Sequence, residues 1–168
     1  SGEEPVVVTD FIEFFQPVQL SYQLADSMLS RKEKDSLLIS YKIFTQFVPD
    51  SVINKIFGKG VKPKIYAFGR AEAPKAETYL FVKTVTTDKK AVLLLAFDKK
   101  HQFITWMTAL RPDAKAATIQ SVTLDRKFTI TKTLLRKNAN GSMSEGKDVY
   151  VLDAAAKNFM LIMTDALE

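Results

Sequence analysis

The chain contains no cysteine, a single histidine and no long apolar run. The absence of cysteine excludes disulfides, thiolate metal ligands and a cysteine nucleophile. A typical structural zinc site needs several Cys or His ligands, so this chain alone does not supply one and we expect no bound metal. No stretch approaches the roughly 18 apolar residues of a membrane-spanning helix, so the sequence predicts no transmembrane segment.

Motifs for cofactors and catalysis are missing as well. The one histidine, His101, lies in a polar turn beside lysines, where a histidine is usually surface decoration and not a catalytic base. The G-K-G of residues 58–60 lacks P-loop spacing and follows a predicted helix instead of a strand. No EF-hand calcium loop is present. The sequence therefore predicts no cofactor and favours a protein that is not an enzyme.

Length and composition indicate a single globular domain spanning residues 1–168. Of the 168 residues, 46% are hydrophobic and 26% charged, which is ordinary for a chain with a substantial core. Charge is uneven: residues 1–30 carry five acidic and no basic side chains, whereas the whole chain has a net charge of +5. Either the acidic start packs on the basic body, or the body binds an anionic partner.

The chain begins with Ser1 and Gly2 instead of methionine, followed by two glutamates and a proline. Such a short acidic start suits the mature end of an exported protein, just after a signal or lipid-attachment segment. It suits a remnant of cloning equally well. Our interpretation is an exported protein, in the periplasm or at the cell surface, with room for a lipid anchor upstream of residue 1.

Residues 1–60 are predicted to be mainly helical. The β-branched run 6–8 favours a short strand, and Asp10 is placed to cap a helix over 10–15. Apolar residues alternate with polar ones over 18–24, which indicates a half-buried strand. Apolar spacing of three and four then predicts an αα-hairpin over 35–57, capped by Asp35 or Ser36, interrupted at Pro49 and ended by Gly58.

Residues 62–110 predict four consecutive antiparallel strands joined by short polar turns. The third run, 91–97, is apolar on both faces, so we place it centrally in the sheet with both faces covered. Gly69 within the first run marks a bulge or a close backbone approach.

A second four-stranded unit is predicted over 116–167, roughly 50 residues further along. The sequence VYVLDAAAKNFMLIMTDAL (149–167) aligns with VLLLAFDKKHQFITWMTAL (92–110), and Lys-Thr occurs at 83–84 and again at 132–133. The pattern resembles a pair of β-propeller-like blades, a half-propeller. That resemblance implies two repeated units with loops gathered on one rim, whereas the alternative is one ordinary antiparallel sheet or sandwich. The fold class is thus α+β, with a helical start and about eight antiparallel strands.

The functional hypothesis is a non-catalytic binding module, an accessory protein for an unidentified protein, peptide or glycan. The longest predicted loop, 136–147, contains the turn-forming Asn140–Gly141 pair and is a candidate for contact with a partner. Exposed aromatic side chains would add stacking surfaces. The candidate ligand-binding residues are Tyr66, Phe68, Trp106 and Asn140.

Two alternatives remain open. The first is a binder of an anionic polymer, nucleic acid or acidic polysaccharide, through Lys62, Lys64, Arg126, Lys127, Arg136 and Lys137. The absence of RNP-like and helix-turn-helix signatures argues against nucleic acid. The second is a carboxylate-based hydrolase, which requires a cleft with two facing acids. Asp148 and Asp153 flank one predicted strand at an odd spacing, so they point to opposite faces and do not form such a pair.

Overall fold

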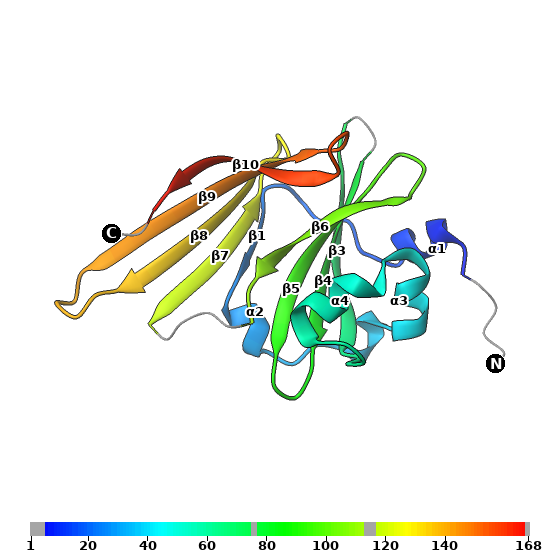
Figure 1. Cartoon of the computed structure of the whole chain (residues 1–168), viewed down its shortest axis with the longest axis horizontal. Coiled ribbons are helices and arrows are strands. Elements are labelled where there is room, and N and C mark those ends of the chain that lie inside the picture. The colour runs from blue at the N-terminus through cyan, green and yellow to red at the C-terminus, as the bar shows by residue number, and fades with distance from the viewer. Residues whose placement is uncertain (1–5, 75–76, 113–116, 167–168) are drawn as a thin grey trace.

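The computed structural model describes residues 6–74, 77–112 and 117–166, and within them two five-stranded antiparallel sheets dominate (Figure 1). The acidic start at residues 1–5 lies outside the described residues. Sheet A comprises, in spatial order, β2 (Leu38–Ile39), β3 (Lys64–Glu72), β4 (Thr78–Val85), β5 (Lys90–Phe97) and β6 (Phe103–Leu110). Sheet B comprises β1 (Tyr22–Ala25), β7 (Thr118–Leu124), β8 (Ile130–Lys137), β9 (Met143–Asp153) and β10 (Asn158–Asp165).

The two predicted four-stranded units are confirmed as consecutive antiparallel meanders, β3 to β6 and β7 to β10. The register shift between Ala67 and Gly69 confirms the bulge in the first strand. β5 is buried along almost its whole length, as its apolar sequence predicted. Its turn to β6 forms because the Asp98 side chain accepts hydrogen bonds from the backbone N–H groups of Lys100 and Gln102, at 2.8 and 3.0 Å.

The structure has ten strands where about eight were predicted, because the N-terminal third adds one strand to each meander. β2 pairs with β3, and β1 pairs with β7. The prediction of helix at Leu38 and Ile39 is therefore wrong. The backbone of these two residues pairs with β3 at the edge of sheet A. The helix begins only after Ser40, whose hydroxyl accepts a hydrogen bond from the Ile43 N–H at 3.1 Å.

The helices agree with the prediction in part. α1 (Val8–Glu13) begins at Val8, so the predicted strand over 6–8 and the cap at Asp10 are both wrong; burial of Phe11 and Ile12 against the core decides where it forms. α3 (Tyr41–Phe47) and α4 (Asp50–Phe57) form the helical pair, and Gly58 ends it with φ of 92°. The predicted start of the hairpin at 35 is a separate 3₁₀ turn, η1 (Asp35–Leu37), and the predicted cap at Asp35 or Ser36 is wrong because Ser40 caps α3. The short helix α2 (Ser27–Ser30) was not predicted.

Two apolar cores arrange the molecule in three layers. Helices α1, α3 and α4 cover one face of sheet A, where Phe44, Ile53 and Leu93 are fully buried. The opposite face of sheet A packs against sheet B, and this second core contains Leu94 and Ile130. The outer face of sheet B carries no covering helix in Figure 1.

The predicted twelve-residue loop over 136–147 is wrong in its length. β8 continues to Lys137 and β9 starts at Met143, so the two strands form one long hairpin with a short tip. The Asn138 N–H donates to the Ser142 carbonyl at 2.8 Å, and Gly141 adopts φ of 88°, which confirms the tight turn at Asn140–Gly141. Strand pairing over 143–147 outweighs the polar composition that indicated a loop.

A buried lysine fixes the segment between β1 and β2 to sheet A. The Lys83 side chain in β4 is 1% exposed, and its ammonium donates to the carbonyls of Met28 and Arg31 at 2.6 and 2.8 Å. The third donor meets the Glu33 carboxylate at 2.8 Å. All three N–H donors of this buried cation are thereby satisfied.

Candidate binding site between the two sheets

The two sheets separate toward one end and leave a cleft of about 740 Å³. Strands β6 and β10 approach one another, and near the start of β10 the Phe159 ring contacts Tyr79 of sheet A at 6.2 Å between centroids. Further along, the strands of sheet B extend past sheet A (Figure 1). The cleft opens there, bordered by β7, β8, β9, the end of β10 and the residues at the end of β6.

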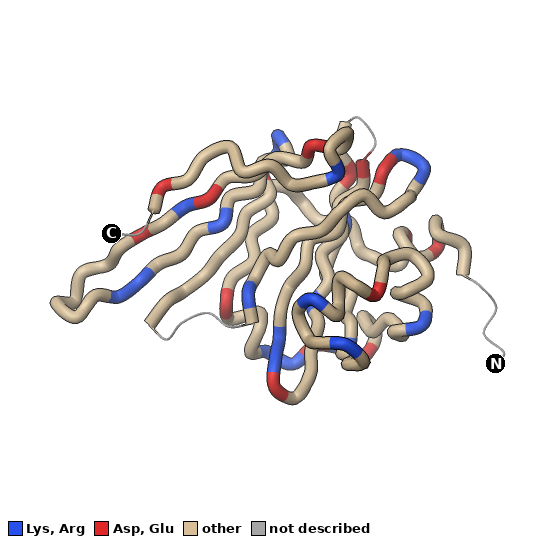
Figure 2. Tube along the Cα trace, in the orientation of Figure 1, with Lys and Arg blue, Asp and Glu red and all other residues tan. Residues whose placement is uncertain are grey.

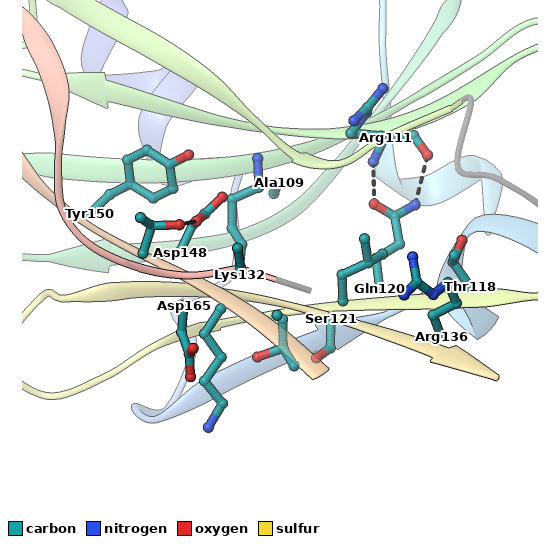
Figure 3. A pocket seen from close by; sticks show the side chains of 16 residues that line it. Ala109, Arg111, Thr118, Gln120, Ser121, Lys132, Arg136, Asp148, Tyr150 and Asp165 are labelled. Carbon is teal, nitrogen blue, oxygen red and sulfur yellow. Dashed lines mark hydrogen bonds between the residues drawn. The ribbon is translucent and has the colours of Figure 1, made fainter. Parts of the chain in front are cut away.

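Strand register decides which side chains face the cleft. Val122, Lys132, Asp148 and Thr164 lie directly opposite one another across β7, β8, β9 and β10. Opposed residues share a face of the sheet, and Val122 belongs to the core between the sheets. Lys132 and Asp148 therefore point toward sheet A and into the cleft, as Figure 3 shows.

The next row across the same strands points the other way, because successive residues of a strand alternate between faces. It consists of Ser121, Thr133, Lys147 and Asp165. Figure 3 shows Ser121 and Asp165 on the far side of the strands from Lys132. By this alternation their side chains lie on the outer face of sheet B. Among the described residues that border the cleft, Asp148 is then the carboxylate that faces it.

Lys132 is the central cation of the cleft. Its ammonium lies 5.7 Å from the centroid of the Tyr150 ring, close enough for a cation–π contact. Burial lowers the pKa of Lys132, the Asp148 carboxylate raises it by a smaller amount, and the Arg111 charge lowers it further. Within the described part of the chain, the ammonium makes no hydrogen bond or ion pair. The net lowering shows that its surroundings do not fully compensate the charge.

The groups around Lys132 are held in place. The Thr164 hydroxyl donates to the Asp148 carboxylate at 2.6 Å, which fixes that acid from the edge strand. Burial raises the pKa of Tyr150, and the nearby Asp148 charge raises it further. The phenol therefore stays neutral and presents a ring and a hydroxyl to the cleft.

Gln120 joins the two sheets at the mouth of the cleft. Its side-chain carbonyl accepts from the Arg111 backbone N–H at 2.8 Å, and its amide donates to the Arg111 carbonyl at 2.8 Å (Figure 3). Its own backbone N–H donates to Asp26 at 2.7 Å. This clamp ties the end of β6 to β7 and keeps the spacing of the cleft constant. Arg136 also lines the cleft, so its border holds Arg111, Lys132 and Arg136, the outward-pointing Lys147 and one inward carboxylate.

The predicted ligand-binding residues lie at three separate places, and none of them lines the cleft. Tyr66 and Phe68 are on β3, where Tyr66 is 7% exposed and the Arg31 guanidinium lies over the Phe68 ring. Trp106 in β6 pairs with Leu95 and faces the helices, on the opposite face of sheet A. Asn140 occupies the tip of the β8–β9 hairpin, where its side chain accepts from Ser142.

The six predicted anion-binding residues also lie at separate places. Lys62 and Lys64 are at the start of β3, and Lys62 lies 6.0 Å from the Tyr41 ring. Arg126 and Lys127 form the β7–β8 turn, whereas Arg136 and Lys137 end β8, roughly 25 Å along the strand. Figure 2 shows basic residues spread over the whole trace. Of these six, Arg136 reaches the cleft.

Sequence reasoning missed Lys132, Asp148, Tyr150 and Gln120. A usable signal was present in β8, where Ile130, Lys132, Leu134 and Arg136 share one face. Two basic residues at inward-facing positions of a strand, where apolar side chains are expected, indicate that the inner face of the strand is only partly covered. The Lys-Thr pairs at 83–84 and 132–133 also placed one lysine in the second strand of each unit.

Comparison with family models, characterised proteins and solved structures finds no match to this chain. Within the described ranges, no three His, Asp or Glu side chains gather as metal ligands. The helices of the described ranges are all too short or too polar to cross a membrane.

Proposed function

We propose that the protein is a non-catalytic binding module that takes a small ligand in the cleft between the two sheets. The observation that carries this proposal is the cleft itself. Its volume of about 740 Å³ lies within the roughly 300–1,000 Å³ typical of small-molecule sites. Polar groups converge in it beside an aromatic ring, and such groups orient a ligand.

Rigid surroundings support a preformed site. The Gln120–Arg111 clamp and the continuous pairing of β7, β8 and β9 fix the walls before any ligand arrives. Preorganisation of this kind reduces the entropy lost on binding. The uncompensated Lys132 ammonium provides one polar contact that a ligand would complete.

A binding role fits the cleft better than hydrolysis by paired acids. Glycoside chemistry of that kind needs two carboxyl groups within about 5–10 Å across the substrate. The Asp148 carboxylate faces the cleft and is already engaged by Thr164, whereas the Asp165 side chain points to the other face.

The architecture also supports a repeated, blade-like organisation of the two units. Each meander gains one N-terminal strand on its first strand, β2 on β3 and β1 on β7. Each carries the Lys-Thr pair in its second strand, with the lysine directed between the sheets. In this proposal the first unit became the covered core and the second kept an open face for ligand.

The test is a ligand screen by thermal shift on the wild type and two tryptophan variants of β8. Leu134→Trp adds bulk inside the cleft, whereas Leu135→Trp places the same bulk on the outer face of the same strand. Compounds that stabilise the wild type should lose their effect in Leu134→Trp and keep it in Leu135→Trp. Equal stabilisation of both folded variants would place the ligand elsewhere and overturn the proposal.

A further inference from the structure

The lysines of the two Lys-Thr pairs, Lys83 and Lys132, differ in the groups that surround their ammonium. Lys83 has three oxygen acceptors within 2.8 Å. The Lys132 ammonium has a cation–π contact with the Tyr150 ring and the electrostatic attraction of the nearby Asp148 carboxylate. Each N–H donor of an ammonium gains most from an anionic acceptor. The cleft therefore has a position at Lys132 for an acidic group, and the positive charges of Arg111 and Arg136 border the same space.

Beyond Lys132 the lining of the cleft includes Tyr150 and Leu134, and the neighbouring edge strand β10 has an exposed apolar run. Met160, Leu161, Ile162 and Met163 follow one another there, and each is between 45% and 55% exposed. Leu161 lies directly opposite Tyr150, so it shares the inner face with that ring. Met160 and Met163 pair with Val151 and Val149 and so lie on the outer face, which leaves Leu161 as the paired apolar side chain of this run on the inner face.

The polar and apolar parts meet within one strand. Thr164 of β10 bonds the Asp148 carboxylate, while Leu161, three residues earlier, lies beside Tyr150. A ligand with its charge at Lys132 would thus have its body against Tyr150 and Leu134 and then along β10. An inorganic anion would use the cation alone and leave the apolar wall in water.

We propose that the ligand is an amphipathic organic acid, with its carboxylate on Lys132 and its alkyl chain along Tyr150 and Leu161 of β10. This inference rests on the proposed binding role of the cleft. It goes further by assigning the chemical class of the ligand and the residue that selects it. The observation behind it is the juxtaposition of a cationic pocket with an exposed apolar edge strand.

The experiment is isothermal titration calorimetry with dodecanoate below its micelle concentration. Acetate supplies the acid without the chain, and dodecyl maltoside supplies the chain without the acid. We expect dodecanoate to bind at one site, and the two comparison compounds to bind at least about tenfold more weakly. Binding of acetate as tight as that of dodecanoate would overturn the apolar half of the assignment. Equal binding of the maltoside would overturn the acidic half.

Lys132→Met keeps the aliphatic length and removes the charge. Loss of a charge-assisted contact of about 1.5–3 kcal/mol should weaken dodecanoate binding by about ten- to a hundredfold. The matched control is Lys147→Met, on the outer face of the adjacent strand, where Lys147 pairs with Glu145 at 3.2 Å. It should bind as the wild type does.

The variants separate failure of this inference from failure of the proposed function. If Leu134→Trp abolishes dodecanoate binding and Lys132→Met leaves it unchanged, the cleft binds ligand and Lys132 does not select it. If dodecanoate binding survives in Leu134→Trp as in Leu135→Trp, the cleft is not the site and both proposals fail. Urea unfolding of each variant establishes that it is folded.

Binding should also depend on pH in a defined direction. The charged and titratable groups that face Lys132 are Asp148 and Tyr150 on β9 and Arg111 after β6. A carboxylate ligand binds the ammonium form, so affinity should be highest below the lowered pKa of Lys132 and fall as pH rises through it. Lys132→Arg keeps its charge over this range, and its binding should not fall. The same alkaline loss in Lys132→Arg would overturn the assignment.

Discussion

Each of the two meanders of this protein carries a Lys-Thr pair in its second strand, Lys83 in β4 and Lys132 in β8, and the two lysines have opposite surroundings. In sheet A, Lys83 is surrounded by Met28, Arg31 and Glu33, and its charge is fully satisfied within the chain. In sheet B, Lys132 faces a cleft, where Asp148 only partly offsets the effect of burial and the pKa of Lys132 is lowered. The difference arises from the covering layers, since the segment after β1 closes over Lys83 and nothing described closes over Lys132.

The comparison extends to the sheets as a whole. Sheet A is enclosed by helices on one face and by sheet B on the other, so Leu93 and Leu94 of β5 are both fully buried. Sheet B is covered on one face and only along part of its length, and its last strand exposes four apolar side chains in succession. The same meander therefore serves as a core in one unit and as a binding wall in the other.

The largest expected effect comes from removing the satisfied lysine. Lys83→Met removes the ammonium that donates to the Met28 and Arg31 carbonyls and to the Glu33 carboxylate, which is 5% exposed and keeps Arg31 as its second partner at 3.0 Å. Loss of a buried charge-assisted partner of this kind should cost about 3 kcal/mol in the free energy of unfolding. Urea unfolding should show this loss, and adding Glu33→Gln should recover part of it. A loss below about 1 kcal/mol would show that Lys83 does not hold the segment between β1 and β2 to sheet A.

The second prediction contrasts leucines from the two sheets. Leu94→Ala in β5 removes a side chain with 0% exposure and should destabilise the fold by about 2–5 kcal/mol. Leu161→Ala in β10, where the side chain is 49% exposed, should change unfolding by no more than about 0.5 kcal/mol. Thermal or urea unfolding measures both, and equal losses would contradict the assignment of β10 as an uncovered surface.

The third prediction concerns the close approach that holds the N-terminal segment to sheet A. The Val18 N–H donates to the Arg70 carbonyl at 2.9 Å, and a Cβ added at Gly69 would overlap the Val18 side chain. Gly69→Ala should therefore cost about 1–3 kcal/mol in unfolding free energy. The double variant Gly69→Ala with Val18→Ala should recover much of that loss. No recovery would mean that the strain lies in the β3 bulge itself.

The smallest effect at neutral pH is expected at Tyr79, where the sheets touch. Tyr79 contacts Phe128 and Phe159, and burial, with help from Glu77, raises its pKa from 10.0 to about 12. The fold thus keeps the neutral phenol, and the stability this provides is present below pH 10 and lost as pH rises toward 12. Between about pH 8 and about pH 11, the unfolding midpoint should fall less in Tyr79→Phe than in the wild type. An equal fall would show that other groups cause the alkaline loss.

The sequence predicted the parts of the fold that depend on local pattern. The two meanders, the buried third strand, the Gly69 bulge and the end of α4 at Gly58 all follow from alternation, apolar runs and glycine placement. The alternation over 18–24 also indicated a strand where β1 (Tyr22–Ala25) forms, whereas β2 was missed because pairing with a distant strand decides it. Leu38 and Ile39 have helical spacing in sequence but gain more as an added strand on β3.

The candidate site could not be predicted because it depends on how far the sheets separate. Alternation places Lys132 and Asp148 on one face, but it does not say whether that face is covered. The predicted aromatic site fails to assemble for the same reason, since Tyr66 and Trp106 lie on opposite faces of sheet A. In retrospect, Lys132 can be recognised as a charged residue at a position of β8 whose side chain points inward.

The most direct test of the central claim is an NMR pH titration of the lysine side chains in the chain with isotope-labelled lysine, with and without dodecanoate. The account predicts that Lys132 titrates below the ordinary lysine range in the free protein, and that dodecanoate raises its pKa while the signals of Lys83 and Lys147 stay unchanged. A Lys132 titration that dodecanoate does not move would contradict the claim that this ammonium is the acid-binding group of an open sheet.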